Sequence, residues 1–147
     1  MFQHILVPTD GSRFSNKAVA TAARLAYALR AKLLVLHVRS PIESPHHVEG
    51  GALATLGGEK VLQEIEDEER KLLDAALKTA AADGTAAQTA FIAGYSTYDA
   101  IIRIAREQHC DLIVMASHGR RGISELLIGS ETQKVLTHTT IPVLVVR

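Results

Sequence analysis

Short apolar segments alternate with segments of helical period along this chain. Five apolar segments rich in β-branched residues indicate strands, at 4–9, 32–38, 86–93, 111–117 and 141–147. Most of them are continuously apolar, a pattern typical of strands that helices cover on both faces. The segment 86–93 mixes polar and apolar positions, so we expect that strand to lie nearer an edge of the sheet.

The segments between these strands predict helices. Apolar residues spaced by three and four favour helices over 15–30, 59–82 and 96–108, and a shorter helix is expected over 130–139. In the third helix, Ser96 followed by Asp99 has the pattern of a capping box. This alternation predicts an α/β fold: an open, doubly wound, Rossmann-like sheet of five parallel strands with helices on both faces. We expect residues 1–147 to form a single domain.

Two strand orders fit this pattern, and they place a ligand crevice differently. Ligands of open parallel sheets bind beyond the carboxyl ends of the strands, where the winding direction reverses. In the order 2-1-3-4-5 the loop after the first strand would share the crevice with 93–97. In the order 3-2-1-4-5 it would face 116–130, which is longer and richer in hydrogen-bond donors. We therefore favour 3-2-1-4-5.

Charge and composition narrow the possible partners. Sixteen basic residues balance sixteen acidic ones, so no net field attracts nucleic acid or an anionic membrane, and an anion site must be local. Apolar segments are too short to span a membrane, and the first residues lack the secretory pattern. The one cysteine, Cys110, cannot form an internal disulfide, which favours a reducing, cytoplasmic setting. We expect Cys110 to be a small buried hydrophobic residue. The segment 40–58 is expected to be a long mobile loop, either a lid or a disordered insertion.

Residues at the ends of the first and fourth strands could form a ligand site. Asp10 offers carboxylate acceptors that suit an amino or hydroxyl donor, and Gly11 lets the chain turn. Gly129 lacks a side chain, so its backbone can approach a ligand, and Ser130 begins a helix whose dipole favours an anion. A structural interpretation stays open, because Asp-Gly is an ordinary helix-entry turn and Ser130 could be only an N-cap. Taken together, an acceptor opposite an anion cradle suits a nucleotide.

These positions carry a resemblance to the universal stress protein family over essentially the full chain. The family signature is Gly, two residues, Gly, nine residues, Gly, then Ser or Thr. The chain has Ala116, Gly119, Gly129 and Ser130 at those spacings, so the first glycine is replaced and a positive φ there would be costly. The opening ILVPTDGS and the close IPVLVVR also fit the family pattern.

The resemblance implies a nucleotide site, with bound ATP (or ADP or AMP) and possibly Mg²⁺. In nucleotide-binding members the position of Asp10 contacts the adenine side, that of Val38 gives backbone contacts to the base, and that of Glu131 offers its N–H to a phosphate. His118 could approach a γ-phosphate, although we favour a hydrogen-bonded loop histidine at this position. The full candidate set is Pro8, Thr9, Asp10, Val38, Ala116, Ser117, His118, Gly119, Gly129, Ser130 and Glu131.

Other polar residues give weaker signals. Of Arg120 and Arg121, we expect at most one to reach a phosphate. His46 and His47 could combine with His37 or His118 in a metal site, but no recognisable ligand spacing supports one, so we expect surface histidines. The metal therefore stays unknown.

The favoured order puts 141–147 at a sheet edge, where unpaired backbone groups favour association. A two-fold dimer with these strands antiparallel would cover that edge, and the family resemblance implies the same. Pro142 would limit the extent of pairing. The leading hypothesis is a dimeric, ATP-binding stress-response module that regulates through nucleotide occupancy and has weak ATPase activity at most. The alternatives are a slow metal-dependent ATP hydrolase and a dimeric interaction protein with a vestigial nucleotide site.

Overall fold

The computed structural model describes residues 1–39, 58–93, 96–118 and 128–147. Within them, strands and helices alternate as the sequence predicts. The elements are β1 (His4–Pro8), α1 (Arg13–Leu29), β2 (Lys32–Arg39), α2 (Gly58–Ala82), β3 (Ala87–Ala93), α3 (Thr97–Glu107), β4 (Leu112–Ala116), α4 (Ser130–His138) and β5 (Val143–Val146). The predicted mobile loop 40–58 lies outside the described residues except for Gly58, which begins α2.

The five strands form one parallel sheet in the order β3-β2-β1-β4-β5, so the favoured order is confirmed. β3 and β5 are the edge strands, as expected from the mixed pattern of 86–93 and from the position of 141–147. β1 lies at the centre, between β2 and β4. The carboxyl ends of β1 and β4 therefore meet at the same edge of the sheet.

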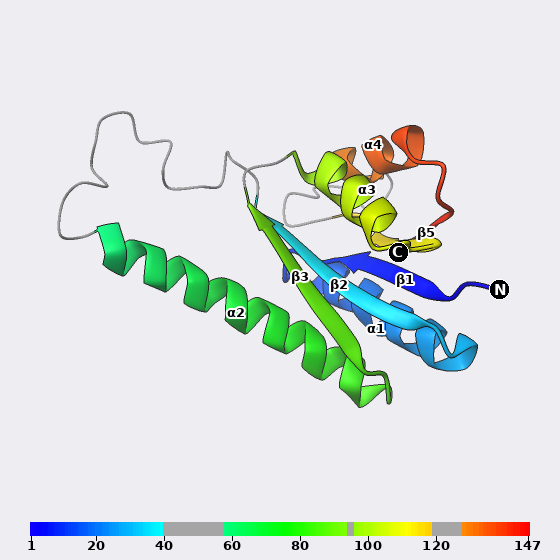
Figure 1. Cartoon of the computed structure of the whole chain (residues 1–147), viewed down its shortest axis with the longest axis horizontal. Coiled ribbons are helices and arrows are strands. Elements are labelled where there is room, and N and C mark those ends of the chain that lie inside the picture. The colour runs from blue at the N-terminus through cyan, green and yellow to red at the C-terminus, as the bar shows by residue number, and fades with distance from the viewer. Residues whose placement is uncertain (40–57, 94–95, 119–127) are drawn as a thin grey trace.

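Helices cover both faces of the sheet (Figure 1), with α1 and α2 on one side and α3 and α4 on the other. Successive residues of β1 point into the two layers. Ile5 and Val7 pack in the core beneath α1 and α2, whereas Leu6 packs in the core beneath α3 and α4. This explains why Ile5, Leu6 and Val7 are apolar in succession rather than at alternate positions.

The first helix lies close to the sheet because its buried face is built mainly of alanine. Ala18, Ala22, Ala23 and Ala26 are at most 1% exposed and pack against the strands. The helix begins at Arg13, two residues before the predicted start, because Ser12 serves as its N-cap and accepts the N–H of Ser15 at 3.2 Å.

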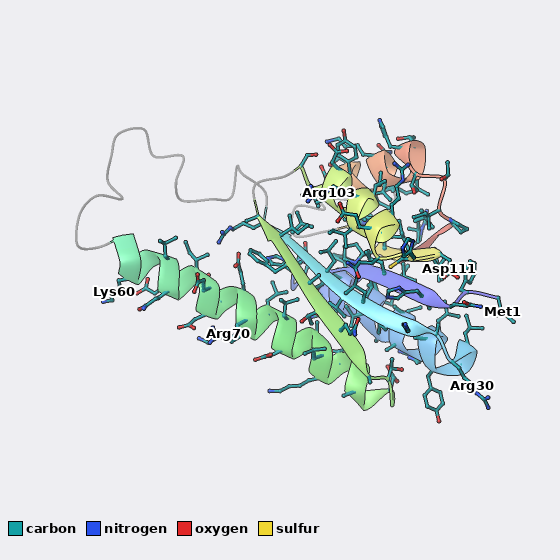
Figure 2. All side chains as sticks on the ribbon, in the orientation of Figure 1. Met1, Arg30, Lys60, Arg70, Arg103 and Asp111 are labelled. Carbon is teal, nitrogen blue, oxygen red and sulfur yellow. The ribbon has the colours of Figure 1, made fainter. Side chains whose placement is uncertain are left out.

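The amino-terminal edge of the sheet is held by one carboxylate. Asp111 accepts the N–H of Gln3 and the N–H of His4, with shortest distances of 2.8 and 2.9 Å, and it lies beside the start of β1 in Figure 2. Burial raises the pKa of this carboxyl, but the backbone hydrogen bonds from His4 and Gln3 outweigh burial, so its pKa lies below the ordinary value.

Charged side chains cover the outer side of α2. Figure 2 shows Lys60 and Arg70 extending away from the sheet on this helix, as expected for a solvated helix surface. Among the described helices, none is both long and apolar enough to cross a membrane.

Candidate functional site

The first and fourth β–α junctions lie side by side. β1 and β4 pair in parallel, with Ile5 opposite Leu112 and Leu6 opposite Ile113. Beyond the strands, the ring of Phe14 in the first turn of α1 contacts the ring of His118 after β4, with centroids 5.8 Å apart. The first and fourth junctions therefore lie together at the carboxyl edge of the sheet, as the favoured strand order requires.

The turn after β1 orients Asp10. Its Oδ1 accepts the N–H of Ser12 at 2.9 Å, which closes an Asx-turn. Gly11 follows with φ of +76°, a left-handed conformation that favours glycine. Pro8 is the last residue of β1 and fixes the direction from which the chain enters this turn. The local sequence thus holds the Asp10 carboxylate at the carboxyl edge of the sheet.

Thr9, although a candidate ligand residue, has its polar groups engaged within the protein. Its N–H donates to the carbonyl of Leu36 at 2.8 Å, and its carbonyl accepts from Nδ1 of His37 at 2.8 Å. Its hydroxyl lies 3.1 Å from Oγ of Ser15. Thr9 is 4% exposed, so it would affect ligand binding indirectly, by holding the turn that carries Asp10.

His37 connects this turn to the edge of the sheet. Because a carbonyl only accepts, Nδ1 of His37 carries the proton in its bond to Thr9. The His37 ring stacks on Phe91 at 5.8 Å, and Arg39 lies over the same ring and pairs with Glu69 at 3.0 Å. Burial raises the pKa of Glu69 despite the attraction of Arg39 and His37.

Val38 presents its backbone to the crevice. The last pair between β1 and β2 is Pro8 opposite Leu36, so Val38 lies two residues past the end of β1. The carbonyl of Leu36 faces β1, where it accepts the N–H of Thr9. Backbone groups alternate in direction along a strand, so the N–H and carbonyl of Val38 face the same side.

Gly129 permits a close approach between the start of α4 and the end of β4. Its N–H donates to the carbonyl of Ser117 at 2.7 Å, and a Cβ at this position would lie 3.1 Å from that oxygen. Its φ is −59°, so glycine is needed for space and not for a left-handed conformation. The Gly129 N–H is already engaged by Ser117, so glycine at this position serves the close packing of the two segments.

Ala116 fits where the family signature has glycine. The φ of Ala116 is not positive, so replacing glycine by alanine at this position causes no backbone strain. That methyl packs toward the core beneath α1 and α2, and its carbonyl accepts from Oγ1 of Thr132 at 2.9 Å. Gly119, Arg120 and Arg121 lie outside the described residues.

Ser130 is the first residue of α4 and is exposed, and Gly129 is the N-cap, so the interpretation of Ser130 as an N-cap is wrong. The hydroxyl of Ser130 makes no hydrogen bond to the described residues. The first N–H groups of a helix have no carbonyl one turn earlier to receive them, which leaves those of Ser130, Glu131 and Thr132 for an anion.

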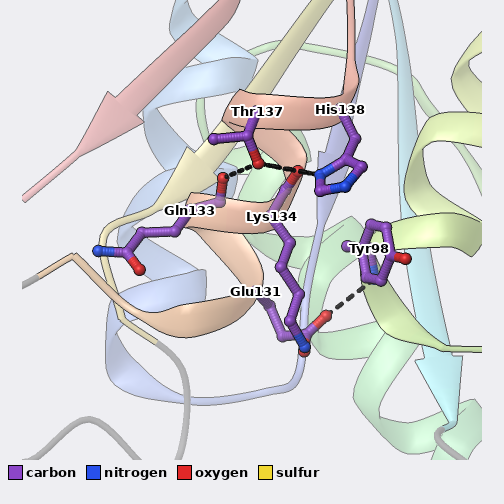
Figure 3. A network of polar contacts seen from close by, with 6 residues as sticks. All are labelled: Tyr98, Glu131, Gln133, Lys134, Thr137 and His138. Atoms are coloured by element: carbon purple, nitrogen blue, oxygen red, sulfur yellow. Dashed lines mark hydrogen bonds and ion pairs between the residues drawn. The ribbon is translucent and has the colours of Figure 1, made fainter.

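The side chain of Glu131 caps a different helix (Figure 3). Its Oε2 accepts the N–H of Tyr98 in the first turn of α3 at 2.9 Å, and its Oε1 lies 3.2 Å from Nζ of Lys134. The predicted capping box is wrong on this point, since Ser96 is the N-cap of α3 but its side chain makes no cap hydrogen bond. A carboxylate distant in sequence supplies that acceptor instead.

His118 and Ser117 line a cavity on the α1 side of the sheet. The cavity has a volume of about 640 Å³, and its described lining is Arg13, Phe14, Lys17, Ser117, His118 and Arg147. Asp10, Val38 and Ser130 are not among these lining residues. Sequence reasoning missed Arg13, Lys17 and Arg147 as a group, because only the fold brings the end of β5 beside the first turn of α1.

The described histidines differ in how far they are buried. His37 is 8% exposed, so the expectation of a surface histidine is wrong for this residue. His118 is 7% exposed and its Nδ1 lies 3.0 Å from Oγ of Ser117, which agrees with a hydrogen-bonded histidine after β4. Within the described residues no group of three or more His, Cys, Asp or Glu side chains could hold a metal ion. His46 and His47 lie outside those residues. Cys110 is buried as expected, and burial raises the pKa of its thiol to about 11, with a further increase from Asp111.

Comparisons with known sequences all point to the same family. A sequence model of the universal stress protein family matches residues 1–147. Universal stress protein YxiE of Bacillus subtilis is 34% identical over 149 residues, with 100% of each chain covered. A universal stress protein of Thermus aquaticus is 32% identical over 152 residues, again with 100% of each chain covered.

Solved structures give the same picture. A universal stress protein in complex with cAMP is 27% identical, with a TM-score of 0.70 over 99% of this chain and 97% of that one. The structure of protein MJ0577 is 25% identical, with a TM-score of 0.80 over 99% of this chain and 96% of that one. The neighbouring folds thus agree with the sheet order and with the layers described above.

Proposed function

Because the chain belongs to the universal stress protein family, we propose that it binds an adenine nucleotide between its first and fourth β–α junctions. The observation that carries this proposal is the parallel pairing of β1 with β4, which puts Asp10 and the start of α4 at one edge of the sheet. An open parallel sheet binds ligands at this kind of position, where the winding direction reverses.

The three parts of a nucleotide each find suitable groups. The carboxylate of Asp10 accepts hydrogen bonds from amino or hydroxyl groups, and the backbone of Val38 offers a donor and an acceptor to a base edge. The first turn of α4, with the Ser130 hydroxyl, attracts phosphates. The cAMP complex of a 27% identical relative supports an adenine ligand at this fold.

ATP is the ligand we favour, because the chain keeps the residues of the signature that would hold the phosphates. Gly119 completes the signature by sequence and Ser130 begins α4. Glu131 would contribute its N–H, while its carboxylate is directed toward α3 by the bond to Tyr98 and by Lys134. That direction reduces the repulsion between this carboxylate and a bound phosphate.

The biological role that follows is a cytoplasmic, dimeric stress-response module whose partner contacts depend on nucleotide occupancy. The free edge of β5 supports the dimer. The carbonyls of Pro142 and Val146 bond to β4, so the backbone groups of Val143 and Val145 face outward. Leu144 is 40% exposed on this strand, which adds apolar area beside an unpaired edge.

A titration tests the nucleotide site directly. Isothermal titration of the full chain should show ATP binding and much weaker GTP binding, and denaturation of freshly purified protein should release adenine nucleotide. Asp10→Asn keeps an oxygen for the N–H of Ser12 but removes the charge, so ATP affinity should fall roughly tenfold or more.

Asp83→Asn is the matched control, since it makes the same change at a half-buried aspartate that pairs with the exposed Arg24, 3.5 Å away. Its ATP affinity should equal that of the unmodified chain. Absence of ATP binding, or equal losses in the two variants, would refute the proposed function.

A further inference from the structure

A groove on the α1 side of the sheet carries cationic side chains that the nucleotide site does not use. Arg13 and Lys17 lie four residues apart and therefore on the same side of α1, and Arg147 follows β5. None of the three side chains makes an ion pair with a described residue, and none of the described lining side chains is acidic. On a chain whose formal net charge is zero, this is a local concentration of positive charge.

A buried polar atom lines the same groove. His118 is only 7% exposed, and its Nε2 has no hydrogen-bond partner among the described residues. Its Nδ1 lies 3.0 Å from Oγ of Ser117. A hydroxyl can donate as well as accept, so Nδ1 can accept from Ser117 while Nε2 carries the proton. Buried polar atoms without a partner are uncommon in folded proteins, and a ligand would satisfy this one.

We infer that this groove binds a small phosphorylated molecule. Guanidinium groups form paired hydrogen bonds to phosphate oxygens, and an ammonium adds a compact charge, so Arg13, Arg147 and Lys17 suit a phosphate. His118 lines the same groove, and its Nε2, which has no partner among the described residues, can donate to a phosphate oxygen once a movement of the ring exposes it. The ring of Phe14, with the Arg13 guanidinium 5.4 Å from its centre, provides an apolar wall for the organic part. A cavity of about 640 Å³ is large enough for such a molecule.

This groove adjoins the proposed nucleotide site and goes beyond it: Ser117 and His118 belong to the candidate nucleotide set, whereas Arg13, Lys17 and Arg147 do not. The groove opens on the face covered by α1, whereas α4 begins on the opposite face. Ser117 and His118 follow β4 and lie between the two. The carbonyl of Ser117 holds the N–H of Gly129, so a ligand on His118 would act on the residue pair that positions the start of α4.

Inorganic pyrophosphate is a suitable probe. Isothermal titration of the full chain saturated with ATP, which fills the phosphate positions of the nucleotide site, should still show pyrophosphate binding. The double variant Arg13→Gln/Lys17→Gln should weaken that binding roughly tenfold or more while leaving ATP affinity unchanged. His118→Phe preserves a planar ring but removes Nε2, and it should also weaken pyrophosphate binding, with thermal unfolding confirming that the variant folds.

The matched control is Arg24→Gln/Lys71→Gln, which removes the same charge from exposed positions outside the groove. It should leave pyrophosphate binding unchanged. Three results would overturn the inference: no binding to the unmodified chain, equal losses in the two double variants, or displacement of ATP by pyrophosphate. If the chain binds no ATP, the same titrations without nucleotide decide the question, so this inference and the proposed function fail separately.

Discussion

Replacing Ser130 with alanine should separate ligand binding from folding. In the structure the Ser130 hydroxyl makes no hydrogen bond to the described residues, and the N-cap of α4 is Gly129. The side chain is exposed at the first position of the helix. The substitution therefore removes no contact of the unliganded protein, and the free energy of unfolding should change by less than about 0.5 kcal/mol.

The effect on nucleotide affinity should be much larger. A hydrogen bond to a charged group contributes about 1.5–3 kcal/mol. Loss of such a bond to a phosphate oxygen corresponds to a decrease in affinity of roughly 10- to 150-fold. The backbone N–H groups of Ser130 and Glu131 persist in the variant, so binding should weaken and not vanish.

Two measurements check this prediction. Isothermal titration gives the ATP affinity, and chemical unfolding without nucleotide gives the stability. A third measurement follows from mass action, since ATP at about 100 times its dissociation constant stabilises the folded state by about 2.7 kcal/mol. At that same ATP concentration the Ser130→Ala chain should show a much smaller increase in thermal stability.

Ser96→Ala is the matched control. Ser96 is also an exposed serine at a helix start whose side chain makes no cap hydrogen bond. Its substitution should leave both stability and ATP affinity unchanged. An ATP affinity for Ser130→Ala within about twofold of the unmodified chain would show that the hydroxyl contributes no such bond, and the reasoning about the start of α4 would be refuted.

Three further predictions concern the scaffold and the edge strand. Gly84→Ala should lower the free energy of unfolding by about 1–2 kcal/mol in urea denaturation, because φ at this position is +75°; ATP affinity should not change. Asp111→Asn should lower stability above the unfolded-state pKa of aspartate, about 3.9, since the pKa of Asp111 is depressed in the folded protein. The difference from the unmodified chain should narrow as pH falls through the folded pKa; a difference independent of pH would contradict this. Val145→Pro removes an outward N–H without breaking the ladder to β4, so analytical ultracentrifugation should detect monomers, and an intact dimer would argue against pairing through β5.

Periodicity predicted the elements, and loop composition predicted their order. The strand order followed from comparing two loops, because a ligand crevice forms where the winding reverses and 116–130 had the richer set of donors. The spacing of the signature identified Gly129, but the sequence did not reveal why glycine is needed there. The structure shows that the Ser117 carbonyl lies 3.1 Å from where a Cβ would be, a contact between two chain segments that no local pattern encodes.

The sequence pattern could not predict contacts between side chains that are distant in sequence. Ser96 and Asp99 fit a capping box, yet the acceptor at α3 comes from Glu131 on another helix. Likewise, Arg13 and Arg147 become neighbours only because β5 lies beside β4, under the first turn of α1. Capping patterns describe neighbours along one helix, and they fail where tertiary packing brings a better acceptor.

The hydrogen bonds at the carboxyl edge of the sheet suggest why the crevice lies between the first and fourth junctions. His37 bonds the second junction to the first through the carbonyl of Thr9, and Glu131 bonds the fourth to the third through the N–H of Tyr98. Each wall of the crevice is thus fixed by a hydrogen bond to another β–α junction. On the α1 side of the crevice, the rings of Phe14 and His118 meet at 5.8 Å, and Nδ1 of His118 lies 3.0 Å from Oγ of Ser117. A ligand entering here finds walls that are already positioned, so less of its binding free energy is spent on ordering them.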